Sequence, residues 1–169
     1  IAVLVRSNER GQEVATALVA AGVPATFNGS NSVLTTAAAA DWLTLLRALD
    51  QPRRPYLRRA FLTDFVGATV ADIALADDDR LGSWSLLVHT WARVLARHGV
   101  PALFAAFDAD TDFRARLLTR PDGERLVTDH RHLAELLHHQ ATRGGSPRAR
   151  DLAAWLVGER DGSSLGADS

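Results

Sequence analysis

The first 27 residues alternate between short apolar runs and one polar, helix-like stretch. Residues 1–5 are mostly apolar and predict a buried strand, and residues 23–27 predict a second short strand. Between them, Ser7 or Asn8 can cap a helix that Gly22 would end. This order of elements predicts a βαβ corner. Because a core strand begins at the first residue, we expect the chain to be a segment of a longer protein.

From Thr35 onward the apolar residues recur at a helical period. Trp42, Leu45 and Leu49 fall on one face of a predicted helix, which Pro52 interrupts. The same kind of stripe, separated by prolines, glycines and capping residues, predicts further helices near residues 57–65, 69–74, 84–99, 101–107, 113–118, 121–140 and 147–156.

The predicted fold class is therefore mainly α, a helical array with a small N-terminal βαβ corner. The tail after Gly158 is rich in glycine, serine and aspartate and has little to bury. We expect residues 161–169 to be mobile.

Composition limits the chemistry that this chain can perform. Its 169 residues carry a formal net charge of −1, with no cysteine and no lysine, so all 19 basic residues are arginine. Without lysine it has no Gly-x-x-x-x-Gly-Lys-Ser/Thr loop for nucleotide hydrolysis, and without cysteine it has no thiolate metal site. A near-neutral charge means that any contact with nucleic acid must be local. The absence of a long apolar run predicts a cytoplasmic protein.

Several short motifs in the first 50 residues follow the order found in a known helicase family. They are Leu4-Val5-Arg6-Ser7-Asn8, Phe27-Asn28-Gly29-Ser30, Val33-Leu34 and Asp41-Trp42-Leu43. In this order they resemble the start of the second motor domain of superfamily 1 DNA helicases of the UvrD and Rep type. The turn at Gly29 and Ser30 belongs to that structural pattern.

Two longer stretches narrow the resemblance. They are Asn31-Ser32-Val33-Leu34-Thr35-Thr36, and Gly123-Glu124-Arg125-Leu126-Val127-Thr128-Asp129 followed by His132-Leu133-Ala134-Glu135-Leu136-Leu137. Together they resemble the beta subunits of exodeoxyribonuclease V, the RecB-type helicase-nucleases. Glu124, Arg125 and Asp129 form the core of the second stretch, where we expect an ion pair between Arg125 and Asp129 across one helical turn.

This resemblance implies a domain organisation. Residues 1–50 would be the leading part of the second RecA-like helicase domain, and residues 51–160 would be a helical subdomain of the 2B type. The parent protein would bind ATP and Mg²⁺ outside this segment, which itself would hold no cofactor and no catalytic residue.

The resemblance also implies a function and partners. The parent would be an ATP-dependent DNA helicase-nuclease that acts in double-strand break repair and recombination. Its partners would be DNA, single-stranded and at a duplex junction, and other subunits of the helicase-nuclease complex. Two alternatives stay open: a non-enzymatic helical interaction module, and a segment of a single-subunit UvrD-like repair helicase.

Arg6 and Asn8 are the first candidate DNA-binding residues. They follow the predicted first strand, where a guanidinium can bind phosphate oxygens in a bidentate manner and an amide can add a hydrogen bond. In the helicases that the chain resembles, these motif positions contact single-stranded DNA. The alternative is that Asn8 only caps the helix and Arg6 is a surface charge.

A second candidate is the dense group of arginines around Pro55. Such a cluster can contact duplex phosphates and add affinity without sequence preference. The alternative is a solvated helix face. The four residues are Arg53, Arg54, Arg58 and Arg59.

Two groups of polar residues invite a metal interpretation. His132, Glu135 and His139 fall on one helical face and carry ligand types that zinc accepts, although such residues more often form a solvated surface. The alternating aspartates of residues 108–112 lack the glycine and the glutamate of a calcium loop. We therefore predict no metal site.

Overall fold

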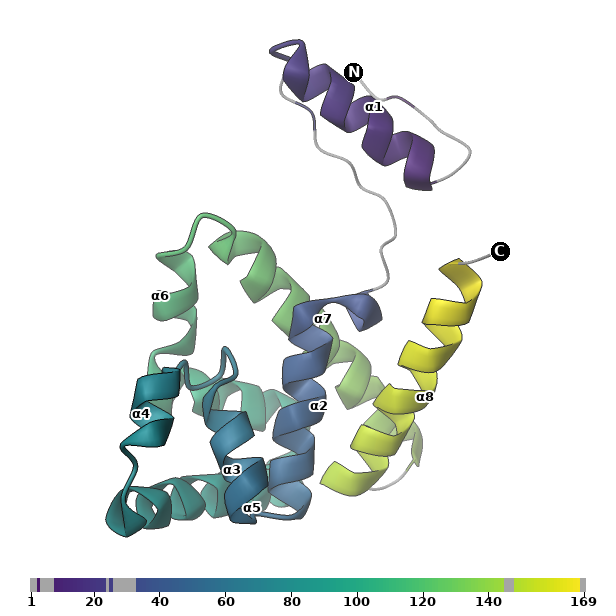
Figure 1. Cartoon of the computed structure of the whole chain (residues 1–169). Helices are drawn as coiled ribbons and strands as arrows, with labels where there is room; N and C mark the ends of the chain where they lie inside the picture. The colour runs from purple at the N-terminus through teal and green to yellow at the C-terminus, as the bar shows by residue number, and fades with distance from the viewer. Residues whose placement is uncertain (1–2, 4–7, 24, 26–32, 145–147, 168–169) are drawn as a thin grey trace. The chain divides into compact units, whose positions relative to one another are not determined.

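The computed structural model describes residues 3, 8–23, 25, 33–144 and 148–167 (Figure 1). The chain divides into two compact units, Ile1–Ser32 and Val33–Ser169. The described residues of both units form helices, turns and loops, and no β-strand occurs among them. None of the described helices is long and apolar enough to cross a membrane.

The first unit contains helix α1, Asn8–Ala20. The helix ends at Ala20, and Gly22, the glycine predicted to end it, follows with a positive φ of 77°. The amide of Val23 donates to the carbonyl of Leu18 at 2.9 Å and that of Gly22 to Val19 at 3.0 Å. These two bonds form a Schellman motif, which a glycine at this position permits.

The two strands of the predicted βαβ corner are not observed. Most of their residues lie outside the described part of the chain, and Val3 is 59% exposed instead of buried. A parallel pair of strands needs further strands and covering helices before it can bury both faces. The fold class is therefore confirmed as mainly α, and the βαβ corner remains a prediction.

The second unit is an array of helices around α2 (Figure 1). Its elements in chain order are η1 (Val33–Thr35), α2 (Ala37–Asp50), α3 (Arg54–Phe61), α4 (Val70–Ala74), α5 (Asp78–Thr111), α6 (Phe113–Leu118), α7 (Gly123–Gly144) and α8 (Ala149–Ala167).

Helix α2 occupies the centre because its sequence is apolar on most sides. It contacts α3, α5, α7 and α8, and eight of its residues are buried. Trp42 is fully buried, and its ring lies 4.9 Å from that of Phe65 and 5.8 Å from that of Phe107. Trp84 and Trp91 are buried too, so the tryptophans predicted on apolar stripes belong to the core in these three cases.

Two glycines shape the array. Gly99 has a φ of 77° and breaks the helical geometry of α5, with Pro101 following it, as the sequence predicted. Gly123 begins α7 against the end of α6, where an added Cβ would lie 2.2 Å from the carbonyl oxygen of Leu117. Only glycine allows the two helices to approach so closely at this point.

The compact units do not divide at residue 50, where the resemblance places a domain boundary. Helix α2 packs within the second unit and contacts α8 extensively. The 50/51 boundary concerns the domains of the parent protein and stays a prediction. The mobility expected for residues 161–169 also stays a prediction, although α8 continues to Ala167.

Candidate nucleic-acid interface and a buried acid–histidine cluster

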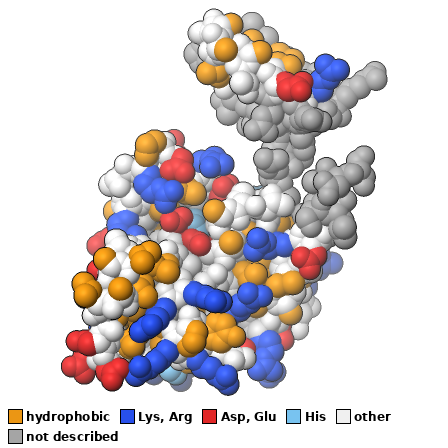
Figure 2. Space-filling model, viewed as in Figure 1, with side chains coloured by type: hydrophobic (Ala, Val, Ile, Leu, Met, Phe, Trp, Pro, Cys, Tyr) orange, Lys and Arg blue, Asp and Glu red, His pale blue; other side chains and the backbone are white. Residues whose placement is uncertain are grey.

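The predicted arginine cluster lies on and just before α3. Arg53 is the residue before the helix, Pro55 occupies its first turn, and Arg58 and Arg59 stand in its last turn, where a cation is favoured by the helix dipole. Leu57, Ala60 and Phe61 face inward, so the arginines are left on the exposed side. Figure 2 shows arginine side chains gathered over α3 and the neighbouring surface.

The arginines of this cluster differ in their partners. Arg54 forms an ion pair with Asp78 at 2.7 Å, with 65% and 82% of the two side chains exposed. The side chains of Arg53, Arg58 and Arg59 are exposed and make no ion pair with any other residue that the structure describes. They therefore present charges that a phosphate could neutralise.

A polar clamp holds the loop that follows α3. Arg116 donates to the carbonyl oxygens of Asp64 and Phe65 at 2.9 and 3.1 Å and to that of Thr111 at 2.8 Å. Thr111 also donates to Phe65 at 2.6 Å. Gly67 leaves room for the guanidinium, because an added Cβ would lie 1.9 Å from Arg116 Nη1. The clamp ties the end of α3 to α5 and α6, so the arginines stand on a fixed helix.

Other predicted site residues belong to the first unit. Arg6, Gly29 and Ser30 lie outside the described residues. Asn8 begins α1, but its side chain is outside the described part as well. Their assignment to DNA binding or to the turn stays a prediction.

The stretch that carries the RecB-type resemblance lies at the start of α7. Glu124 and Arg125 are exposed and Asp129 is half-buried. The ion pair expected between Arg125 and Asp129 is not observed among the described residues. Three residues of this stretch contribute to packing. Gly123 lies against the backbone of Leu117, and Leu126 and His130 are buried.

Three titratable side chains from different parts of the second unit come together beside the core: Asp41 of α2, Asp64 of the loop after α3, and His130 of α7. Their ligand atoms all lie within 4.8 Å of one another, and His130 is 0% exposed. His130 Nε2 lies 3.5 Å from Asp64 Oδ2, and the amide of Asp64 donates to Asp41 Oδ2 at 2.7 Å.

Neighbouring groups complete this acid–histidine cluster, which consists of Asp41, Asp64 and His130. Arg120 donates to Asp64 Oδ1 at 3.0 Å, and Trp42 Nε1 donates to the carbonyl oxygen of His130 at 3.2 Å. The rings of Phe65 and Phe113 pack edge-on against the imidazole at 4.9 and 5.1 Å. His130 Nδ1 is buried without a hydrogen-bond partner among the described residues.

The two carboxylates of the cluster have opposite electrostatic environments. Burial raises the pKa of Asp41 above its usual value, against the hydrogen bond from the Asp64 amide. For Asp64, the hydrogen bond with His130 lowers the pKa, and Arg120 acts in the same direction. The folded state therefore favours the ionised form of Asp64 and disfavours that of Asp41, whose carboxylate accepts the backbone hydrogen bond from Asp64.

The cluster contains ligand types that a divalent cation accepts, but both of its carboxylates already have partners. Asp64 is shared between His130 and Arg120, and Asp41 is bound by an amide. A guanidinium in contact with the same carboxylate competes electrostatically with a metal ion. We interpret the cluster as a structural network that joins α2, the loop after α3, and α7.

Other candidate metal ligands are used structurally or are exposed. His132, Glu135 and His139 lie on the exposed surface of α7. Within residues 108–112, Asp108 binds Arg114, Asp110 accepts from Trp91 Nε1 at 2.7 Å, and Asp112 ends α5 in a left-handed conformation.

The acid–histidine cluster could not be recognised in advance. His130 did give one signal, since it shares the inward stripe of α7 with Leu126, Leu133 and Leu137. Asp41 and Asp64 gave no such signal, because the local sequence does not show that α2 and the loop after α3 both contact His130.

Comparison with known proteins identifies related chains. No protein-family model matches the sequence. The chain is 38% identical over 170 residues to RecBCD enzyme subunit RecB of Mycolicibacterium smegmatis, which covers 100% of this chain and 15% of the relative. It is 37% identical over 159 residues to RecB of Mycobacterium tuberculosis, with 92% of this chain and 14% of the relative covered.

A more distant relative shows the same pattern of coverage. RecB of Escherichia coli is 31% identical over 161 residues, or 92% of this chain and 13% of the relative. The chain thus spans about 15% or less of the length of these curated relatives. The resemblance to RecB-type subunits is therefore confirmed, since the similarity to RecB extends along the whole chain.

Proposed function

We propose that this chain is a segment of a RecB-type subunit and contributes to an ATP-dependent DNA helicase-nuclease in double-strand break repair and recombination. The observation that carries the proposal is the similarity to RecB along the whole chain. In this proposal residues 1–50 form the leading part of the second motor domain, βαβ corner included, and residues 51–160 form a 2B-like subdomain. ATP and Mg²⁺ bind elsewhere in the parent, which is cytoplasmic.

The segment's own role in this proposal is to bind and orient DNA through α3. Arg53, directly before α3, and Arg58 and Arg59 on it are exposed, and Arg116 holds the loop that follows the helix. Guanidinium groups bind phosphate oxygens without reading the bases, which suits an enzyme that moves along DNA of any sequence. Arg54 contributes less, because Asp78 already neutralises part of its charge.

The test is a salt titration of DNA binding by the 169-residue chain, with single-stranded and forked oligonucleotides. The double variant Arg58→Ala/Arg59→Ala should bind forked DNA about tenfold more weakly and reduce the slope of log K against log salt by about 2. Arg54→Ala should have a smaller effect.

Arg125→Ala serves as the matched control, since it removes an exposed arginine from α7 instead of α3. It should leave binding nearly unchanged. The role of α3 is refuted if the double variant keeps the affinity and salt slope of the wild-type chain. Arg6→Ala tests the first unit in the same assay. The chain alone should show no ATPase activity.

A second role, contact with partner subunits, is favoured by exposed apolar side chains on α4 and at the residue directly after it. Val70 and Leu75 are 76% and 83% exposed, and Figure 2 shows hydrophobic side chains gathered over this part of the unit. A contiguous patch of exposed apolar side chains is typical of interaction surfaces. The relatives carry the name of a subunit of the RecBCD enzyme. In a reconstituted complex, Val70→Ser/Leu75→Ser should weaken subunit association without affecting DNA binding by the chain alone.

A further inference from the structure

A groove opens to solvent between η1, α2 and α8. Its cavity volume is about 430 Å³, within the range of sites that hold small organic ligands. Leu34, Leu43 and Val157 form an apolar wall, and Arg47 and Arg160 line the same groove. The groove thus combines apolar surface with two cationic side chains.

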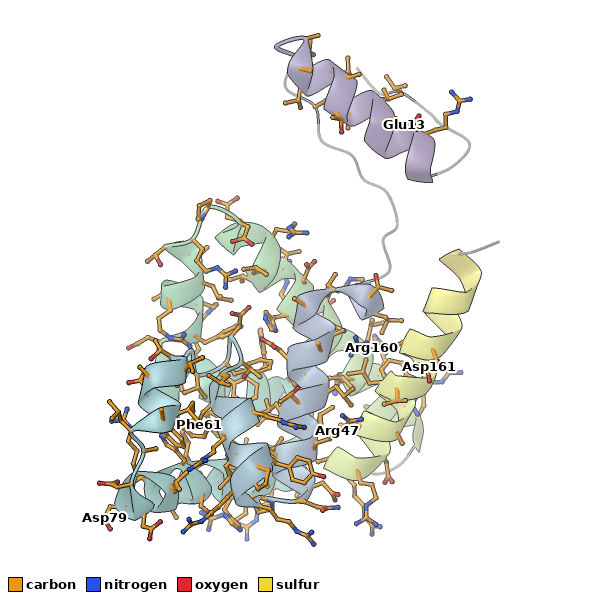
Figure 3. All side chains as sticks on the ribbon, in the orientation of Figure 1. Glu13, Arg47, Phe61, Asp79, Arg160 and Asp161 are labelled. Carbon is orange, nitrogen blue, oxygen red and sulfur yellow. The ribbon has the colours of Figure 1, made fainter. Side chains whose placement is uncertain are left out.

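The two arginines come from segments that are far apart in the sequence. Arg47 lies on α2 and Arg160 on α8, and Figure 3 shows both in the region where these helices face each other. Arg47 is exposed and Arg160 is half-buried. Neither guanidinium forms an ion pair or hydrogen bond with another residue that the structure describes. Two such guanidiniums facing one cavity suit a phosphate group, which arginine binds through several oxygens.

We infer that this groove binds one nucleotide of a DNA strand, with the phosphate held by Arg47 and Arg160. The sugar or base would lie against Leu34, Leu43 and Val157. This inference rests on the proposed function. It adds a second site of DNA contact to the one proposed on α3.

The surface around the groove favours a strand over a free nucleotide. Helix α3 packs directly on α2, which carries Arg47. Figure 2 shows arginine side chains from α3 across to the surface between α2 and α8. A strand that binds the α3 arginines can therefore continue along charged surface to the groove. A free nucleotide would use only the groove.

Asp161 gives the groove one acidic edge. A carboxylate repels a phosphate, so the phosphate belongs on the side of Arg47 and Arg160. Removal of this charge should strengthen binding modestly. Asp161→Asn is therefore a variant whose effect should be opposite in sign to that of the arginine variants.

The experiment measures anisotropy of a labelled thymidine oligonucleotide with the 169-residue chain over a range of salt concentrations. Arg47→Ala and Arg160→Ala should each lower affinity about fivefold and reduce the salt slope by about 1. Arg47→Lys should recover part of the loss. Arg97→Ala, which removes an exposed arginine of α5, is the matched control and should have little effect. Thermal melts establish that every variant is folded.

Two further ligands test whether the groove binds a DNA strand or any compound that carries a phosphate. An oligonucleotide of the same length with an uncharged methylphosphonate backbone should bind weakly and should not distinguish Arg47→Ala from wild type. Thymidine monophosphate should compete with the labelled strand only at much higher concentration. Competition by the monophosphate at strand-like concentration would overturn the assignment to a DNA strand.

The outcomes distinguish DNA binding by the groove from DNA binding by α3. Loss of affinity in the groove variants supports the inference. If Arg47→Ala and Arg160→Ala bind like wild type while Arg58→Ala/Arg59→Ala is weakened, the groove inference is overturned and the proposed function stands. If only the groove variants lose affinity for DNA, the role of α3 is refuted and the groove inference is supported. Absence of DNA binding by the wild-type chain overturns both.

Discussion

Helix α3 and the acid–histidine cluster use charged residues in opposite ways. On α3, Arg58 and Arg59 are exposed and have no ion-pair partner among the described residues. In the cluster, Asp64 binds both His130 and Arg120, and the imidazole is completely buried. Unpartnered surface charge costs little in water and remains available for a ligand, whereas buried charge must be matched by the protein itself.

This difference separates a candidate binding surface from a structural network. Changes in the cluster should therefore alter the free energy of unfolding, and changes on α3 should alter DNA binding. The two should be measurable independently in the same chain.

The largest expected effect comes from Gly123→Ala. The new Cβ would lie 2.2 Å from the backbone oxygen of Leu117, and backbone cannot move aside as a side chain can. The start of α7 would shift, and His130 with it. We expect a loss of about 3 kcal/mol in the free energy of unfolding, measured by urea denaturation. Gly158→Ala, where nothing lies within 4 Å of the added atom, is the control and should not destabilise.

Asp64→Ala should have the next largest effect. It removes the partner of His130 Nε2 and one of the two carboxylates that pair with Arg120, and an unpaired buried polar group costs about 2 kcal/mol. Adding His130→Leu should restore part of the loss, because the orphaned imidazole is then gone. If the double variant is less stable than Asp64→Ala alone, the cluster is not the network described above.

The effect of Asp64→Ala should also depend on pH. The pKa of Asp64 is lowered in the folded state, so its contribution is present above the usual aspartate value of 3.8 and disappears as pH falls through the folded-state pKa. The stability difference between wild type and Asp64→Ala should therefore shrink in acid. A difference that grows with acidity would contradict the stated environment of Asp64.

Asp41→Asn should have a smaller effect of the opposite sign. Burial raises the pKa of Asp41, so the folded state disfavours its ionised form. The stability that the neutral carboxyl contributes is therefore lost as pH rises through the folded-state pKa. The neutral amide can still accept from the Asp64 amide. At pH 7 we expect a gain of less than about 1 kcal/mol after solvent screening, and little difference near pH 3. Thermal melts at both pH values measure it.

The smallest effect on stability should come from Arg58→Ala/Arg59→Ala. Both side chains are exposed and unpaired within the described part of the chain, so the free energy of unfolding should change by no more than about 0.5 kcal/mol. The same variant should lose DNA affinity, as proposed above. A large loss of stability would mean that α3 contributes to folding through its arginines.

Local sequence was sufficient for most of the helices. The apolar period around Trp42, the capping residue Thr69 and the break at Gly99 are signals within a few residues of one another. Thr69 forms the full capping box with Asp72 that such a residue permits. The exposed arginines of α3 could also be predicted, because the inward positions of the same helix are apolar.

The ion pair from Arg125 to Asp129 shows where local reasoning fails. The two residues are four positions apart on one helix, yet no ion pair between them is observed among the described residues. Exposed pairs at this spacing contribute only a few tenths of a kcal/mol, so spacing alone does not hold them together. The importance of the stretch comes instead from the close approach of Gly123 to α6.

The sequence by itself determined the helical class, the positions of most helices, the arginine-rich surface of α3 and the similarity to RecB. The tertiary structure alone decided the meeting of Asp41, Asp64 and His130, and the convergence of Arg47 and Arg160 on one groove. Helix formation depends on neighbours within one or two turns, which the sequence displays directly. Contacts between distant segments depend on how whole helices pack, and that is a property of the folded core.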